Sequence, residues 1–270
     1  TERLRFRIGD GYTFFVSHRK RTVASTEELP RYTVAEAARY LRMPEATLRT
    51  WVVGRRYSVS SGSKRSETLI RRPNSEDSRL SFSNLVEAHV LAALRRIHRV
   101  RMRDVREALA YTREKLGIER VLLSKDLRTA DRNVFLSRIG KLLNVGRGGQ
   151  EAIAEVFNAY LERIEWDSRE SPIRVFPLTR DDYHGAPRVV TIDPRIAFGR
   201  PVVDRRSIST AVIAERFRAG ESVNVIAEDY DLEASEVEEA LRYEALVNPL
   251  ERLGIAKNRR VSKKAGQSAP

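Results

Sequence analysis

The chain has 270 residues, of which 41% are hydrophobic, and it contains no cysteine, which excludes disulfides, thiolate zinc sites and cysteine nucleophiles. It has no apolar run of the roughly 18 residues that a membrane-spanning helix needs, so we expect a cytoplasmic protein. The net charge of +13 is segregated: residues 1–150 contain 32 Lys and Arg against 16 Asp and Glu, whereas residues 151–250 contain 12 against 20. The first part therefore suits a polyanion, and the second part would be repelled by one.

The first predicted element is a basic arm at residues 1–29. Apolar side chains alternate from Leu4 to Ile8 and recur at 12–16, a pattern typical of short strands. A basic run at 18–21 follows them. We expect a short strand or arm in this part of the chain.

Two short helices joined by a tight turn are predicted between Thr33 and Gly54. Thr33 and Glu36 have the spacing of a capping box, in which each side chain bonds the backbone N–H of the other residue. Pro44 suits the first turn of the second helix. This spacing is typical of a helix-turn-helix, whose second helix enters the major groove of DNA. The apolar positions that would face the core are Val34, Ala37, Ala38, Leu41, Leu48, Trp51 and Val52.

A β-hairpin is predicted after the second helix, with strands at 57–59 and 68–70 and a turn rich in Ser and Gly at 60–63. It would form a wing that grips phosphates, with Lys64 and Arg65 near its tip and two further arginines at its base. The residues expected to bind DNA are Thr33, Thr47, Arg49, Thr50, Arg55, Arg56, Lys64, Arg65, Arg71 and Arg72.

The segment Tyr32-Thr33-Val34-Ala35-Glu36-Ala37-Ala38 and the signature Thr47-Leu48-Arg49-Thr50-Trp51 resemble the opening of MerR-type winged helix-turn-helix domains. The resemblance covers the unit at 30–82 and implies a MerR-like domain that binds operator DNA as a dimer. Two features depart from the family pattern: the basic arm before this unit and the lack of a long dimerising helix at the chain's end.

The middle of the chain is predicted to be helical. Residues 83–170 contain three apolar stripes at helical spacing, and we expect a helical linker or dimerisation region there. The Gly-rich stretch at 146–149 is predicted to be a loop, because it lacks the Lys-Ser/Thr pair of a phosphate-binding loop. Residues 171–187 contain three prolines and predict a linker or a pair of edge strands.

A second compact unit is predicted at 188–250, with strands at 189–192 and 201–203 followed by three helices. The last two helices again have helix-turn-helix spacing, but four glutamates would face outward from the final one. Because carboxylates repel phosphate, this unit is expected to contact protein instead of DNA. The predicted helices span 210–219, 222–230 and 234–246, and the glutamates are Glu233, Glu236, Glu238 and Glu239.

The motifs Gly199-Arg200-Pro201-Val202, Ala219-Gly220-Glu221-Ser222 and Ala227-Glu228-Asp229-Tyr230 resemble the domain of unknown function 433, which occurs in VapB-like antitoxins. Where that family has a Gly-Thr-Arg-Ile turn, this chain has Arg205-Arg206-Ser207-Ile208, so no role of that turn is carried over. Together with the amino-terminal domain, the resemblance implies a dimeric antitoxin that represses its own operon and neutralises a PIN-like ribonuclease toxin. The basic tail at 251–270, predicted to be disordered, would reach the toxin through Arg252, Lys257, Arg259 and Arg260.

The fold class expected from these elements is mainly α, with a winged helix-turn-helix, a central helical region and a small unit of strands and helices. No residues have the spacing of an enzyme active site, so we expect no catalysis, no cofactor and no metal. Two alternatives to the antitoxin remain open. One is a MerR-type one-component regulator in which residues 83–180 bind a small effector near Phe157, Tyr160 and Trp166. The other is an interaction scaffold that does not bind DNA.

Overall fold

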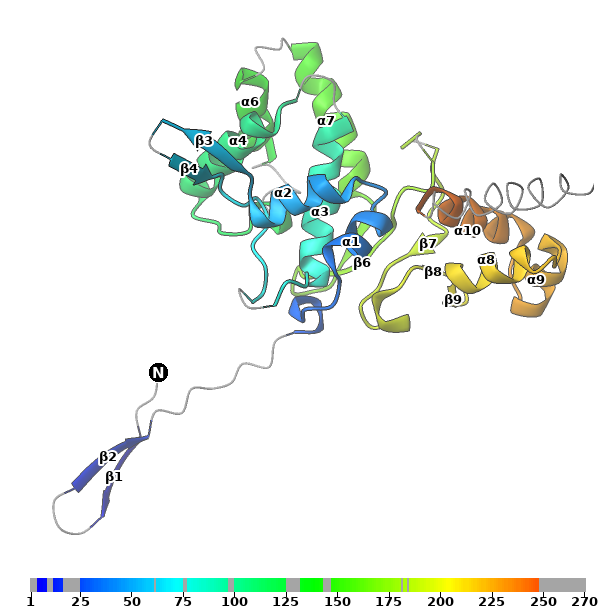
Figure 1. Cartoon of the computed structure of the whole chain (residues 1–270), viewed down its shortest axis with the longest axis horizontal. Helices are drawn as coiled ribbons and strands as arrows, with labels where there is room; N and C mark the ends of the chain where they lie inside the picture. The colour runs from blue at the N-terminus through cyan, green and yellow to red at the C-terminus, as the bar shows by residue number, and fades with distance from the viewer. Residues whose placement is uncertain are drawn as a thin grey trace, which may run out of the picture.

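The computed structural model is mainly α-helical with small antiparallel sheets, as the sequence predicts (Figure 1). Within the part of the chain that is described, no helix is long and apolar enough to cross a bilayer. The basic run at 18–21 and the tail at 251–270 lie outside the described residues. The structure describes residues 4–8, 12–16, 25–60, 62–74, 77–96, 100–124, 132–142, 147–180, 182–183 and 185–247.

The amino-terminal part, where a short strand or arm is predicted, contains two strands. β1 (Leu4–Ile8) and β2 (Tyr12–Val16) pair antiparallel, with Leu4 opposite Val16. The 3₁₀-helix η1 (Thr26–Glu28) follows and packs against the central helix α3 (Phe82–Arg96). The chain therefore joins the main core at η1.

The central helix α3 is the axis of that core. Every side chain from Phe82 to Leu91 is buried, including the polar Asn84 and His89. A surface helix buries only one stripe, so burial on all sides requires neighbours around the whole helix. These neighbours come from widely separated parts of the chain. The elements that contact α3 most extensively are η1, η2 (Val121–Leu123), α7 (Arg147–Leu161) and β6 (Pro172–Val175). α4 (Met102–Leu116) packs on η2 and on α6 (Arg132–Leu142), which in turn packs on α7.

The prediction of a loop at the Gly-rich stretch is wrong for residues 147–149, because α7 begins at Arg147 and includes Gly148 and Gly149. A glycine costs a helix about 1 kcal/mol relative to alanine. The apolar face of α7 offsets this cost by packing Ile153 and Phe157 into the main core. Tertiary burial, more than local preference, determines where this helix begins.

A single buried arginine holds the segment after α7 in place. β5 (Ile164–Trp166) pairs with β6 (Pro172–Val175), and the following residues wrap back over Arg163, which is only 4% exposed. Its guanidinium donates hydrogen bonds to four backbone carbonyls, and burial lowers the pKa of Arg163 to about 10. The acceptors are Phe176 O at 2.7 Å, Ala186 O at 2.9 Å, Pro187 O at 3.0 Å and Pro177 O at 3.2 Å.

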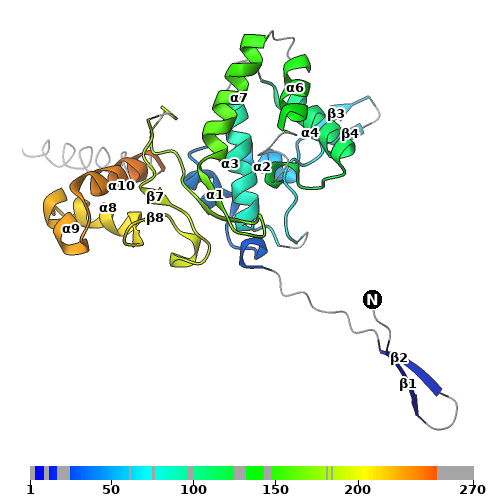
Figure 2. The ribbon, with the colours of Figure 1, turned by 180° about the vertical axis from the view of Figure 1, so that it is seen from behind.

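The carboxy-terminal unit has the strands and three helices that the sequence predicts. Its sheet has the order β7-β8-β9, and α10 packs across α8 and α9. The hairpin strands β3 (Arg56–Val59) and β4 (Gly62–Arg65) lie on one side of α2 (Glu45–Val53), and the carboxy-terminal unit lies on the other (Figure 1, Figure 2). The elements are β7 (Val190–Thr191), η3 (Ala197–Gly199), β8 (Val202–Val203), β9 (Ile208–Ser209), α8 (Thr210–Arg218), α9 (Val223–Tyr230) and α10 (Ala234–Val247).

Helix α10 docks this unit onto the amino-terminal part, and this overturns the outward orientation predicted for Glu239. Glu239 is only 1% exposed and accepts hydrogen bonds from Thr179 and from Arg180, whose Nη2 lies 2.8 Å from Glu239 Oε2. Burial alone would raise the pKa of Glu239, but these bonds hold it below its usual value. The hydroxyl of Tyr243, one helical turn further on, donates to Tyr40 O at 3.0 Å.

The other predicted acidic positions of α10 are also partly engaged within the chain. Arg205 lies 3.2 Å from Glu233 and 3.5 Å from Glu236, so these two carboxylates are paired at the turn between α9 and α10. Of the four glutamates, Glu238 is the exposed one for which the described residues provide no ion pair. The acidic face of α10 is therefore smaller than the sequence pattern predicts.

We predict that Arg163→Met lowers the free energy of unfolding by about 3 kcal/mol or more, because several buried carbonyls lose a charged donor at once. Arg169→Met is the matched control, since Arg169 is exposed, and it should change stability by less than about 0.5 kcal/mol. Urea unfolding of both variants measures the difference. Equal losses would mean that Arg163 does not hold this segment.

Candidate nucleic-acid interface

The candidate interface begins with two short helices, α1 (Val34–Tyr40) and α2 (Glu45–Val53). The predicted capping box is present: Glu36 N donates to Thr33 Oγ1 at 3.1 Å, and Thr33 N donates to Glu36 Oε2 at 2.9 Å. The Thr33 hydroxyl also donates to Glu36 Oε2 at 2.8 Å. In the free protein, Thr33 therefore caps the amino-terminal end of α1.

Helix α2 is oriented as a recognition helix requires. Leu48, Trp51 and Val52 are buried, as predicted, while the opposite face carries the exposed residues Glu45 and Arg49. Arg49 forms an ion pair with Glu45 one turn earlier, and both side chains face solvent. The pair keeps the guanidinium extended along the exposed face, where an incoming base or phosphate can compete with the carboxylate.

The two threonines of α2 differ in their surroundings. The Thr50 hydroxyl donates to Ala46 O at 2.8 Å, so it lies on the exposed side and bonds its own helix. Thr47 faces α3, where its hydroxyl accepts a hydrogen bond from Arg95 Nη1 at 2.9 Å. Arg95 is a residue that the sequence analysis missed. Its position at the end of a long predicted helix gives no sign that it reaches α2.

The wing is a hairpin of β3 (Arg56–Val59) and β4 (Gly62–Arg65), and its register corrects the prediction. Val59 pairs with Gly62, so only residues 60 and 61 connect the strands. Such a tight connection places Arg65 opposite Arg56 at the base of the hairpin and Lys64 opposite Tyr57 beside it, so neither residue lies near the tip as predicted. Residues 68–70 are not a strand of the wing.

Segment 68–70 instead anchors the wing to α2. The N–H groups of Leu69 and Ile70 both donate to Trp51 O, at 2.7 and 3.1 Å, and both side chains are buried. At the end of α2, Gly54 has φ +79°, and a Cβ there would overlap the carbonyl oxygen of Ser66. Wing and recognition helix are therefore held in direct contact.

The wing concentrates positive charge that the described part of the protein does not neutralise. Arg56 and Arg65 lie opposite each other on one face, and Lys64 lies opposite Tyr57 on the other. Like charges directly across a strand pair are destabilising unless something neutralises them. Among the described residues, no carboxylate pairs with Arg55, Arg56, Lys64 or Arg65. Tyr57 is exposed, and it is a candidate contact that the sequence analysis treated only as part of a strand.

Arg71 and Arg72 line a different part of the surface. They border a groove of about 1010 Å³ that begins at Arg65 and runs beside α3 and α4. Arg71 is exposed, 3.9 Å from Glu119, and Arg72 donates to Asp77 O at 3.0 Å. The structure therefore brings Arg65, Arg71 and Arg72 together along one groove, apart from the exposed face of α2.

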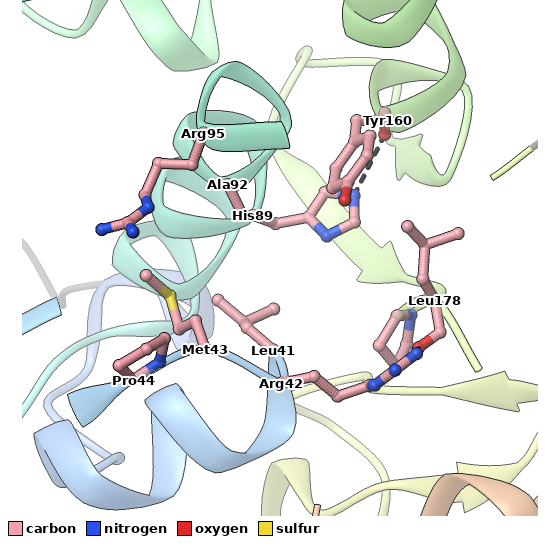
Figure 3. Close-up of a pocket in the computed structure, with 10 residues that line it drawn as sticks. Leu41, Arg42, Met43, Pro44, His89, Ala92, Arg95, Tyr160 and Leu178 are labelled. Carbon is pink, nitrogen blue, oxygen red and sulfur yellow. Dashed lines mark hydrogen bonds between the residues drawn. The ribbon is translucent and has the colours of Figure 1, made fainter. Parts of the chain in front are cut away.

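A small cavity of about 180 Å³ lies beneath the turn between α1 and α2 (Figure 3). His89 and Arg95 on α3, Tyr160 on α7 and Leu178 line it from one side. His89 Nε2 lies 3.1 Å from Tyr160 O, and its buried ring packs against the ring of Tyr160. Of the aromatic residues predicted to lie near an effector, Tyr160 borders this cavity, whereas Phe157 is buried against Phe135. The toxin contacts proposed at Arg252, Lys257, Arg259 and Arg260 lie outside the described residues.

Comparison with known proteins gives one family match in the amino-terminal half of the chain and another in the carboxy-terminal unit. Residues 30–109 match a family described as "Putative DNA-binding HTH domain", and residues 190–243 match "Protein of unknown function (DUF433)". The chain is 32% identical over 232 residues to the "Putative antitoxin VapB45" of Mycobacterium tuberculosis (strain ATCC 25618 / H37Rv), covering 79% of this chain and 93% of that protein. It also resembles the crystal structure of Rv2018 from Mycobacterium tuberculosis. The TM-score is 0.56 at 28% identity, over 79% of this chain and 98% of that chain.

We predict that Gly54→Ala loosens the wing. The substitution combines a positive φ with a steric overlap, so it should lower the free energy of unfolding by about 3 kcal/mol. Gly117→Ala is the control, because Gly117 also has a positive φ but has no atom near its added Cβ; we expect a loss of about 1 kcal/mol. Thermal unfolding of both variants gives the comparison, and identical losses would show that contact with Ser66 is unimportant.

Proposed function

Because the chain belongs to the family of VapB45-like antitoxins, we propose that it binds its own operator as a dimer and represses the operon that encodes it. We further propose that it neutralises a PIN-like ribonuclease toxin through its carboxy-terminal part. The observation that supports DNA binding most directly is the unneutralised positive wing held against the exposed face of α2.

The proposed contacts with DNA divide into two kinds. α2 would enter the major groove, where Arg49 leaves Glu45 and bonds a guanine edge or a phosphate, and Thr50 contacts a neighbouring base or phosphate. The wing would lie over the flanking backbone and release counterions there. The proposed phosphate contacts are Arg55, Arg56, Lys64 and Arg65, with Arg71 and Arg72 further along the groove and Thr33 at the start of α1.

The toxin would be contacted by the other end of the chain. Charge supports this division, since residues 151–250 carry more Asp and Glu than Lys and Arg and would be repelled by DNA. PIN-type active sites are clusters of metal-binding carboxylates, so the basic stretch at 251–270 suits their charge. The proposed contacts there are Arg252, Lys257, Arg259 and Arg260.

The cavity beneath the helix-turn-helix supports a second candidate function, a one-component regulator that senses a small effector. A molecule in this cavity would touch both the turn before α2 and Arg95, which holds Thr47. It could therefore displace α2 and change operator affinity. Co-purification separates the two candidates: a tightly bound nuclease supports the antitoxin, and operator affinity that changes with a metabolite extract supports the regulator.

We predict that Arg49→Ala weakens binding to the operator by about 1–3 kcal/mol while leaving binding to random duplex nearly unchanged. Lys64→Ala should instead weaken both duplexes alike and reduce the slope of log affinity against log salt concentration by about one. Titration of a labelled duplex from upstream of the gene, and of a random duplex, at several salt concentrations measures both effects.

Glu45→Gln is the control for Arg49, because it releases the guanidinium and removes a negative charge from the same face. We expect it to leave operator affinity equal or stronger. If Arg49→Ala and Lys64→Ala produced the same pattern, the division of roles between helix and wing would be wrong. Wild-type affinity that does not respond to salt would argue against DNA binding itself.

A further inference from the structure

An exposed aromatic side chain stands on a strained turn in the carboxy-terminal unit. Three consecutive residues of η3 have positive φ: Ala197 at 46°, Phe198 at 57° and Gly199 at 75°. Only glycine adopts this region freely, and bulky residues there are uncommon. Phe198 is nevertheless 83% exposed, the largest exposure among the large hydrophobic residues that the structure describes as exposed.

The turn is held in this conformation by contact with the helix-turn-helix part. Gly199 is buried, and a Cβ at this position would overlap the hydroxyl of Tyr32 and approach Arg31 Cδ to 3.0 Å. The chain can therefore pass so close to Tyr32 only because residue 199 is glycine. This close approach fixes the direction of the turn, and the neighbouring Phe198 is presented to solvent. Strain that costs stability in the free protein is typical of functional sites.

Positive charge surrounds Phe198. Phe198 borders a hollow of about 320 Å³ together with Leu29, Arg31 and Arg200. Glu36, the carboxylate of this hollow, is engaged in the capping box of α1. Within the described residues, the guanidinium groups of Arg31 and Arg200 have no carboxylate partner, and Arg31 Nε is buried without an acceptor.

The hollow continues across the junction between the two units of the protein. A second hollow of about 230 Å³ shares Glu36, Tyr40 and Arg200 with the first one and extends to Ala211 and Val247. Glu244 also lines it, and this carboxylate accepts a hydrogen bond from the Thr210 hydroxyl. The two hollows form one groove, whose walls come from α1, the β8 region and α10. An extended segment of another protein could lie along it, with Phe198 at one end.

We propose that Phe198, Arg31 and Arg200 form a docking surface for the cognate toxin, which would contribute an apolar socket with acidic residues at its rim. This inference rests on the proposed antitoxin function and adds a contact site distinct from the basic tail. A buried aromatic anchor beside arginines is the composition that dominates binding energy in protein interfaces.

Charge argues against other occupants of this surface. The chain's own tail at 251–270 has six Lys and Arg against one Asp or Glu, so it would be repelled by Arg31 and Arg200. Duplex DNA is disfavoured by the unit that carries Phe198, because residues 188–247 contain 12 Asp and Glu against 8 Arg. The wing also lies on the opposite side of α2 from this unit (Figure 2).

The test uses the full chain and the purified product of the neighbouring gene, with affinity measured at low and high salt. Phe198→Ala should weaken the complex more than about tenfold. Arg200→Glu should weaken it as well and reverse its salt dependence. Phe198→Gly should also lose binding, yet melt at or above the wild-type temperature, because it relieves the positive φ. Phe217→Ala, which removes a 46% exposed phenylalanine on α8, is the matched control and should bind normally.

The possible results distinguish a wrong docking surface from a wrong antitoxin function. If the wild-type chain binds the gene product and Phe198→Ala binds it equally well, the docking surface is wrong and the antitoxin function stands. If the wild-type chain does not bind the gene product, both proposals fail. Weaker binding of Phe198→Ala to operator DNA, or its conversion of a dimer of this chain to a monomer, would likewise overturn the assignment to a toxin.

Discussion

The structure depends on the junction at the end of α2. There the buried Trp51 places its side chain in the core while its carbonyl accepts the N–H groups of Leu69 and Ile70. Gly54, one residue beyond the helix, lets the backbone pass against Ser66. Without this junction, the wing and the recognition helix would be two independent charged segments. With it, they form one rigid surface whose cations have a fixed spacing, as binding to a phosphate backbone requires.

Buried charge fixes the parts around this surface. Glu87 on α3 is almost fully buried and is paired with Arg120, which also bonds Glu28 of η1. Asn84 bonds Glu87 and also donates to Arg71 O at 2.9 Å, so it connects the same network to the segment that follows the wing. A buried pair stabilises a fold only weakly, but removing one partner is costly. The network therefore fixes the positions of η1, α3 and the segment around Arg71 relative to one another.

The junction between the two units gives the protein a second kind of surface. The Tyr243 hydroxyl bonds Tyr40 O, and Glu239 is enclosed by Thr179 and Arg180, so α10 is joined to α1 and to the segment before β7. A partner bound along this junction would contact α1 without touching the exposed face of α2. The surfaces proposed for DNA and for a protein partner are therefore separate apart from α1, which contributes to both.

Much of the fold could be predicted from the sequence because local residue patterns determine it. The capping box of Thr33 and Glu36, the buried face of α2 and the helices after Ser209 each depend on residues within one or two turns. The segregation of charge along the chain likewise identifies which end suits DNA. These features need no knowledge of what packs against them.

Tertiary structure decided the features that depend on distant partners. Arg65 was predicted near the tip of the wing but lies at its base, because the two-residue turn determines the register of the strands and composition does not. Glu239 became buried because Thr179 and Arg180 meet it across some sixty positions of sequence. Arg95 reaches Thr47 only after α3 has packed behind α2. The exposure of Phe198 follows from the contact between Gly199 and Tyr32. Periodicity within one segment carries no information about such pairs, since they form only when separate elements are brought together.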